Sequence, residues 1–149
     1  MGDGVTISLN DGIVAGTTVF TTTNAGTSIF IQDNSGDVTV LVPSAFTSGV
    51  IDLIEDTATD ISAQQDELAV TNNAITSFSV GQGDDTGEIR ITATAKSAAT
   101  TAAELGINTD EATALRGAVI ATAGDATLTD AFTTVLQAGG ASARTAAEQ

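Results

Sequence analysis

The sequence predicts an α+β fold with a β-rich N-terminal part and a helical C-terminal part. Short runs that alternate apolar and polar residues fill much of the first 96 residues, and Gly, Asn and Asp separate them as turns require. Beyond residue 97 the chain is rich in Ala and is interrupted by glycines, which is typical of short helices. We expect a β-rich domain over residues 1–96 and a helical region over 97–149, packed on that domain or on a neighbouring subunit.

The first forty residues predict antiparallel hairpins. Val5–Leu9 alternates apolar with polar side chains, and Asn10–Gly12 supplies a turn. Thr17–Thr21 is the next predicted strand. The clearest hairpin joins residues 27–33 to residues 37–42 through an Asn-Ser-Gly turn, since isoleucine and valine occupy alternate positions on both sides.

The spacing of apolar residues changes after Pro43. Large apolar residues now return at steps near three, four and seven, which predicts an amphipathic helix over about 46–68 that packs on the sheet. The residues that carry this pattern are Phe46, Val50, Leu53, Ile54, Ile61 and Leu68.

The rest of the chain predicts two further strands and then helices. The strands are expected at 74–80 and 88–94, where β-branched and aromatic residues alternate with Ser and Thr. Helices are expected near 98–105, 110–123 and 127–147, because glycines separate these Ala-rich segments.

The charge distribution argues against two classes of partner. The chain has 19 acidic and 4 basic residues, and residues 1–89 hold all but six of the carboxylates and no Lys or Arg. Nucleic acid and anionic membranes would be repelled by such a surface, so we predict neither as a partner. The basic residues Arg90, Lys96, Arg116 and Arg144 all follow this stretch, which suggests head-to-tail attraction between copies.

The residue types that are missing argue against catalysis. Without Cys or His the sequence offers no thiolate, no disulfide and no imidazole base. A Ser paired with Lys96 is the remaining nucleophile arrangement, and no motif surrounds it. Paired carboxylates also lack the Trp or Tyr platforms of sugar sites. We therefore predict no enzyme and no catalytic or cofactor-binding residues.

The loop from Gly81 to Glu88 is the best candidate for ion binding. Its glycines permit a tight fold, and Asp84, Asp85 and Glu88 offer the hard oxygen ligands that calcium prefers. The spacing differs from that of an EF-hand. The alternative is a polar turn without an ion, because turns favour Asp and Gly in any case.

The order of elements resembles a module of extracellular bacterial assemblies. It is similar to the hook "IN" motif of flagellins and flagellar cap or hook-associated proteins, with Val50–Ile54 on the helix and Gly87–Ala93 as the later strand. The small-residue segment ends in Ala102–Ile107, as this resemblance implies. The stretch from Leu105 to Val119 and then Thr127–Leu136 resembles part of certain phage tail-sheath-like proteins. Both resemblances imply surface display in a repeated assembly without catalysis.

These observations predict a non-enzymatic structural subunit of a phage virion that acts by self-assembly, as a capsid decoration or cement protein or as a tail component. Its partners would be copies of itself and other structural proteins, on the surface of a virion or extracellular assembly. Met1–Gly4 has no basic or apolar run, so we expect no signal peptide.

One alternative is an outer surface domain of a flagellin or of a flagellar cap or hook-associated protein. A complete flagellin needs long terminal helices, whereas this chain opens with predicted strands, so only an outer domain would fit that family. A second is a calcium-dependent adhesion module, with calcium as its possible ion.

Overall fold

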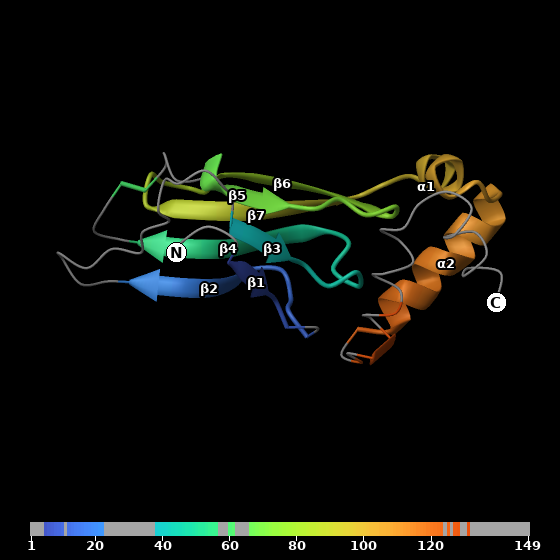
Figure 1. Cartoon of the computed structure of the whole chain (residues 1–149), viewed down its shortest axis with the longest axis horizontal. Helices are drawn as coiled ribbons and strands as arrows, with labels where there is room; N and C mark the ends of the chain where they lie inside the picture. The colour runs from blue at the N-terminus through green and yellow to red at the C-terminus, as the bar shows by residue number, and fades with distance from the viewer. Residues whose placement is uncertain are drawn as a thin grey trace.

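The computed structural model describes residues 5–10, 12–22, 38–56, 60–61, 66–123, 125, 127–128 and 131. Within these residues the chain forms two sheets and two helices, and the helices lie beyond one end of the sheets (Figure 1). The strands are β1 (Thr6–Ser8), β2 (Thr17–Thr22), β3 (Val38–Leu41), β4 (Gly49–Asp56), β5 (Leu68–Val70), β6 (Thr76–Gln82) and β7 (Glu88–Ala95), and the helices are α1 (Ala98–Leu105) and α2 (Thr109–Ala121). The predicted α+β class is confirmed.

The two sheets enclose one hydrophobic core. The smaller sheet has the strand order β1-β3-β5, and both of its strand pairs are parallel. The larger sheet has the order β2-β4-β7-β6, in which β2 and β4 are parallel and the other pairs are antiparallel. Val38 and Val40 of the smaller sheet share a buried cluster with Ile51, Ile89 and Ile91 of the larger sheet. Burial of these branched side chains holds the sheets together.

The prediction of antiparallel hairpins at the N-terminus is wrong. In the hairpin predicted for 27–33 and 37–42, residues 38–41 form β3, and both edges of β3 are already paired, with β1 on one side and β5 on the other. Residues 27–33 lie outside the described part of the chain. The strands β1 and β2 form parallel pairs with β3 and β4, which come much later in the sequence. Alternation identifies a strand but does not identify its partner.

The predicted helix over 46–68 is also wrong, because β4 occupies the middle of this range and β5 begins at Leu68. A β-bulge explains the error, since the register between β4 and β7 shifts between Asp52 and Ile54. Leu53 and Ile54 are consecutive in sequence, and both are fully buried. The bulge therefore breaks strict alternation and produces a spacing that imitates a helix.

The remaining predicted elements are confirmed where the structure describes them. The strands expected at 74–80 and 88–94 are β6 and β7, with small shifts at their ends. The helices expected at 98–105 and 110–123 are α1 and α2. Most of the helix expected at 127–147 falls outside the described residues. No helix within the described ranges is long and apolar enough to cross a membrane.

Short-range hydrogen bonds determine where the helices begin and end. Ser97 Oγ accepts a hydrogen bond from the Thr100 amide at 3.1 Å and caps α1. Asn108 and Glu111 form a capping box at the start of α2. Gly106 ends α1 with a φ of 70°, a left-handed conformation that glycine adopts without strain.

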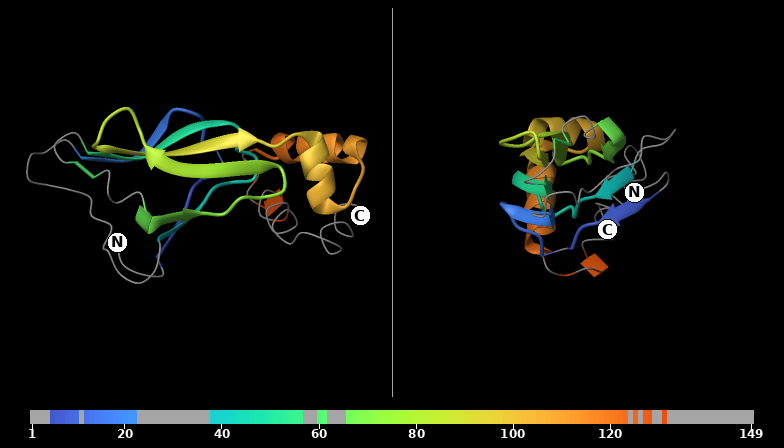
Figure 2. Two further views of the ribbon diagram at one scale, coloured as in Figure 1. Left: turned by 90° about the horizontal axis from the view of Figure 1, so that it is seen from above. Right: turned by 90° about the vertical axis from the view of Figure 1, so that its left-hand side faces the viewer.

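A second, smaller core joins the helices to the sheets. Ile75, from the turn before β6, is buried with Leu105 of α1 and Val119 of α2. The Lys96 amide donates to the Ile75 carbonyl at 2.9 Å, so the end of β7 is attached to the same turn. These contacts place the helical hairpin at the end of the larger sheet, as the left view in Figure 2 shows.

Gly49, the first residue of β4, has a φ of 114°, and a Cβ added there would lie 2.7 Å from the Cβ of Ala15. We expect Gly49→Ala to lower the free energy of unfolding by about 1–3 kcal/mol, because alanine would suffer both backbone strain and a close contact. Urea denaturation followed by circular dichroism measures this change. Gly81→Ala is the matched control, since a Cβ there meets nothing within 4 Å. An equal loss in both variants would contradict the prediction.

Candidate functional site

Four charged residues of the larger sheet, Asp52, Glu55, Glu88 and Arg90, lie on its outer face, the face that points away from the core, whereas Asp56 at the end of β4 is buried. Asp52 of β4 lies opposite Arg90 of β7, and Glu55 lies opposite Glu88. The residues before and after Arg90 point to the opposite face and are fully buried. Strand alternation therefore separates the charges from the core and brings them together on one surface.

Arg90 binds three carboxylates with its one guanidinium group. Its Nε donates to Asp52 Oδ1 at 2.7 Å, and its Nη2 donates to Glu88 Oε1 at 2.8 Å. Asp84 accepts from both terminal nitrogens, at 3.1 and 3.2 Å. The side chains of Arg90, Asp52 and Glu88 are 22%, 17% and 11% exposed, which partly shields these ion pairs from water. We call these four residues the Arg90 cluster.

Glu88 also organises the turn between β6 and β7. Its Oε2 accepts a hydrogen bond from the Asp84 amide at 2.7 Å. The carboxylate lies directly over Gly83, where any Cβ would collide with it. The Gly83 amide donates to the Glu88 carbonyl at 2.8 Å. Glycine at position 83 therefore allows the Glu88 side chain to fold back over its own turn.

The same turn is attached to the last residue of β4 and to the chain that follows it. The Asp56 amide donates to the Gly87 carbonyl at 2.7 Å, and the Ile61 amide donates to the Thr86 carbonyl at 2.8 Å. Asp85 Oδ1 accepts from the Gly87 amide at 2.8 Å. The Arg90 cluster and these main-chain bonds together fix the position of the turn relative to β4.

The three predicted calcium ligands do not act together in this turn. Asp84 and Glu88 converge, but they converge on Arg90, while Asp85 bonds to its own turn. Among the residues that the structure describes, no three acidic side chains are arranged to hold a metal ion. A calcium ion would have to displace the guanidinium group, and calcium binding stays a prediction.

Sequence reasoning missed Asp52 and Arg90 as members of this cluster. A signal was available for Arg90, because it is the first basic residue after a long stretch that contains 13 of the 19 carboxylates. The first cation in such a chain is expected to serve several acids. No local signal identified Asp52, since it lies 38 residues from Arg90 in sequence.

Arg90 and burial shift the pKa values of the cluster in opposite directions. The hydrogen bonds and charge of Arg90 lower the pKa of Asp84 below its ordinary value. Burial raises the pKa of Glu88, and the hydrogen bond and charge of Asp52 add to the rise, which outweighs the opposing effects of the Asp84 amide and Arg90. The hydrogen bonds that Arg90 donates to Asp84 and Asp52 raise the pKa of Arg90 above its ordinary value.

The other basic residues also have partners within the chain. Lys96 Nζ binds both carboxylate oxygens of Glu104, at 2.7 and 2.9 Å. Arg116 Nη1 donates to the Lys96 carbonyl at 3.0 Å. Arg144 lies outside the described residues. The predicted head-to-tail attraction between copies would need basic side chains that can reach a second molecule. In the described ranges each basic side chain already has a contact within its own chain.

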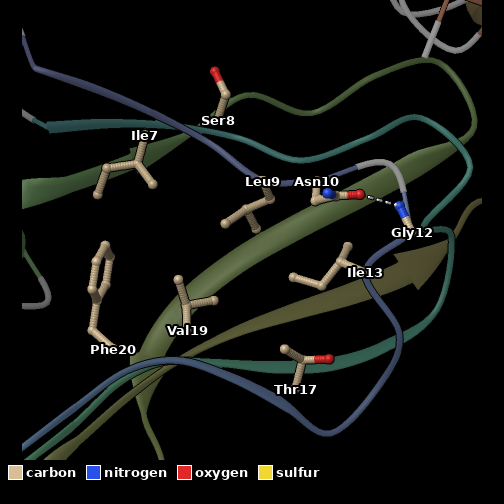
Figure 3. A pocket seen from close by; sticks show the side chains of 9 residues that line it. All are labelled: Ile7, Ser8, Leu9, Asn10, Gly12, Ile13, Thr17, Val19 and Phe20. Atoms are coloured by element: carbon tan, nitrogen blue, oxygen red, sulfur yellow. Dashed lines mark hydrogen bonds between the residues drawn. The ribbon is translucent and has the colours of Figure 1, made fainter. Parts of the chain in front are cut away.

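A pocket of about 540 Å³ opens where β1 and β2 part (Figure 3). Its lining is mainly apolar and comprises Ile7, Ser8, Leu9, Asn10, Gly12, Ile13, Thr17, Val19 and Phe20. Two of the polar groups at its border bond locally: Asn10 Oδ1 accepts from the Gly12 amide, and the Thr17 hydroxyl donates to the Val14 carbonyl, both at 2.8 Å. These two groups are therefore committed to the fold rather than directed at a ligand.

The described residues around this pocket carry no charge. Residues 5–10 and 12–22 contain no acidic or basic side chain, although Asp11 lies between the two ranges in the sequence and the chain as a whole has a net charge of −15. Val5 is 38% exposed and Val14 is 65% exposed. We call residues 5–10 and 12–22 the uncharged side of the molecule.

No protein-family model, curated protein or solved structure matches this chain.

Replacing Arg90 with methionine is expected to lower the free energy of unfolding by about 1–3 kcal/mol, because partly buried carboxylates lose their partner. The variant should also gain a calcium response, with a melting temperature that rises in millimolar calcium, while the wild type shows none. Differential scanning fluorimetry measures both effects.

Lys96→Met is the matched control, because it removes a cation from a separate ion pair with Glu104. It should show no calcium response. An equal calcium response in the wild type and in Arg90→Met would contradict the claim that the guanidinium group blocks the ion.

Glu88 should make stability depend on pH in a defined direction. Its pKa is raised above the ordinary 4.5, so the folded state holds this proton more tightly than the unfolded state. The wild type therefore loses stability as pH rises from near 4.5 through the raised pKa. Glu88→Gln cannot titrate, and its stability relative to the wild type should increase across that window in urea denaturation.

Asp84→Asn should change the pH dependence of stability in the opposite direction. The pKa of Asp84 is lowered from 3.8, so the wild type loses this contribution as pH falls below that value, whereas the variant does not. A Glu88→Gln difference that stays constant with pH would contradict the assignment.

Proposed function

We propose that this chain is a non-enzymatic structural subunit of a self-assembling particle, and that the particle is a phage virion, in which it serves as a decoration or cement protein or as a tail component. The observation that carries this proposal is the uncharged side of the molecule. It presents exposed valines and an apolar pocket on an otherwise strongly acidic protein. Surfaces of this kind are typical of protein contacts.

Net charge explains why such a surface favours self-association. Two copies with a net charge of −15 each repel one another over most of their surfaces. The described residues of the uncharged side bring no carboxylate of their own to such a contact. This side therefore favours contact between copies, or with another structural protein, at residues 5–10 and 12–22.

The charged residues support a structural role as well. Arg90 binds Asp52, Asp84 and Glu88, and these bonds fix the turn between β6 and β7. Their geometry stabilises the fold. The cluster is consistent with a rigid building block.

We favour the virion over the two alternatives. The resemblance to flagellar proteins places Val50–Ile54 on a helix, and this segment is strand β4. The adhesion module depends on calcium ligands in the Gly81–Glu88 loop, where Asp84 and Glu88 bind Arg90 instead.

Light scattering after size exclusion tests self-association. We expect a mass above the 14.8 kDa of one chain at rising protein concentration, without a requirement for calcium. Added salt should strengthen the association, because it screens repulsion between acidic copies. Association that weakens in salt would instead support attraction between opposite charges.

Mass spectrometry of purified particles tests the virion assignment separately. The chain should be recovered in stoichiometric amounts from phage particles, and its absence from all of them would reject the assignment.

A further inference from the structure

We propose that the pocket between β1 and β2 is a binding site for an uncharged, apolar small molecule. The site goes beyond the proposed self-assembly, because a ligand there needs no second copy of the chain. The pocket has a volume of about 540 Å³. Pockets for small molecules commonly measure about 300–1,000 Å³, whereas one water molecule occupies about 30 Å³ of the liquid. The space is therefore large enough for a whole organic molecule.

The pocket lies beside the main hydrophobic core. The strands β1 and β2 belong to different sheets, so the space between them is bordered by both layers of the fold. Five of its lining residues also pack against the buried core cluster, and these are Ile7, Leu9, Ile13, Val19 and Phe20. A ligand in the pocket would contact these side chains and extend the core outward.

The apolar side chains converge on the pocket from two segments of the chain. In Figure 3, Ile7 and Leu9 point into the space from one segment. Val19 and Phe20 point into it from the other. Ser8 lies between Ile7 and Leu9 in sequence and points away, as alternation in an extended segment requires. The pocket is therefore apolar on two facing sides, and the ring of Phe20 offers a surface for a flat ligand.

The lining also determines which charge a ligand can have. None of the nine lining residues is charged, so a charged group would lose hydration in the pocket without gaining an ion pair from them. The side chains of Asn10 and Thr17 already form hydrogen bonds within the chain. An anion would in addition be repelled by the net charge of −15. These properties favour an uncharged molecule that depends on apolar contact.

Occupation of the pocket should stabilise the fold. The five apolar lining residues that touch the core are only partly buried in the free chain, and a ligand would remove more of their surface from water. A ligand that binds the folded state alone raises the stability of that state as its concentration rises. Binding should therefore be visible as an increase in melting temperature.

A neutral fluorescent probe tests the proposal in the full chain. N-phenylnaphthylamine is uncharged, and its emission increases in an apolar environment. We expect saturable binding of one probe per chain, and a melting temperature that rises with the concentration of the probe. The titration is made at a protein concentration where light scattering gives the 14.8 kDa mass of a single chain, so contacts between copies do not contribute.

A charged relative of the probe tests the chemistry of the site. Anilinonaphthalene sulfonate has the same aromatic rings and adds one negative charge. We expect it to bind at least about 10-fold more weakly than the neutral probe, because the lining offers no cation to the sulfonate.

Substitutions that fill the pocket locate the bound probe. Ile13→Trp and Leu9→Trp each place a larger side chain in the space, and we expect either to raise the dissociation constant of the neutral probe at least about 10-fold. Val14→Trp is the matched control and should bind like the wild type, because Val14 is 65% exposed and does not line the pocket.

Two spectra check these variants. Circular dichroism shows whether each variant folds, and if one of the two filling variants does not, the other decides the test. The wild type has no tryptophan, so each variant contains a single one. Its emission should lie at shorter wavelength in the filling variants than in Val14→Trp, because the pocket shields the indole ring from water.

The outcomes are independent of self-association. Saturable binding that favours the neutral probe and is weakened by pocket filling, but not by Val14→Trp, supports the site. The proposal is overturned if the wild type shows no saturable binding, if both probes bind equally, or if the filling variants and the control bind alike. Each result applies to a single chain, so the proposed function is judged separately by the mass at higher concentration.

Discussion

The extra residue that β4 carries at Leu53 determines the arrangement of both faces of the larger sheet. Strict alternation would turn either Leu53 or Ile54 away from the core, and the bulge buries both. On the outer face, Asp52 lies opposite Arg90 just before the bulge. The next outward residue of β4 is Glu55, three positions later instead of the two positions of a regular strand, and it lies opposite Glu88. The core and the Arg90 cluster therefore depend on one backbone irregularity.

The scarcity of basic residues gives Arg90 its importance. No cation precedes it in the sequence, so one guanidinium group neutralises carboxylates from β4, from the turn and from β7. Its contacts are not equivalent, since the pKa of exposed Asp84 falls while that of buried Glu88 rises. The cluster carries more negative than positive charge, and its stability depends on shielding from water as well as on ion pairing.

The sequence predicted those elements whose determining contacts are local. The strands β6 and β7 are joined by one turn, and Ser97 and Asn108 mark the starts of the two helices. The parallel pairs could not be predicted, because periodicity contains no information about distant partners. The acidic turn was recognised from Asp84 and Glu88, but its function as a binding partner of Arg90 depends on Asp52, which tertiary structure alone brings near.

The strand order has a consequence for the way in which the chain folds. The pairing of β6 with β7 is the one pair in the described sheets that forms between sequence neighbours, and closing so short a loop is fast. The strands β1 and β2 must wait for β3 and β4, which a ribosome makes later. The strands β1 and β2 thus stay unpaired while the intervening chain is made, and during that interval their uncharged residues are exposed to other nascent copies.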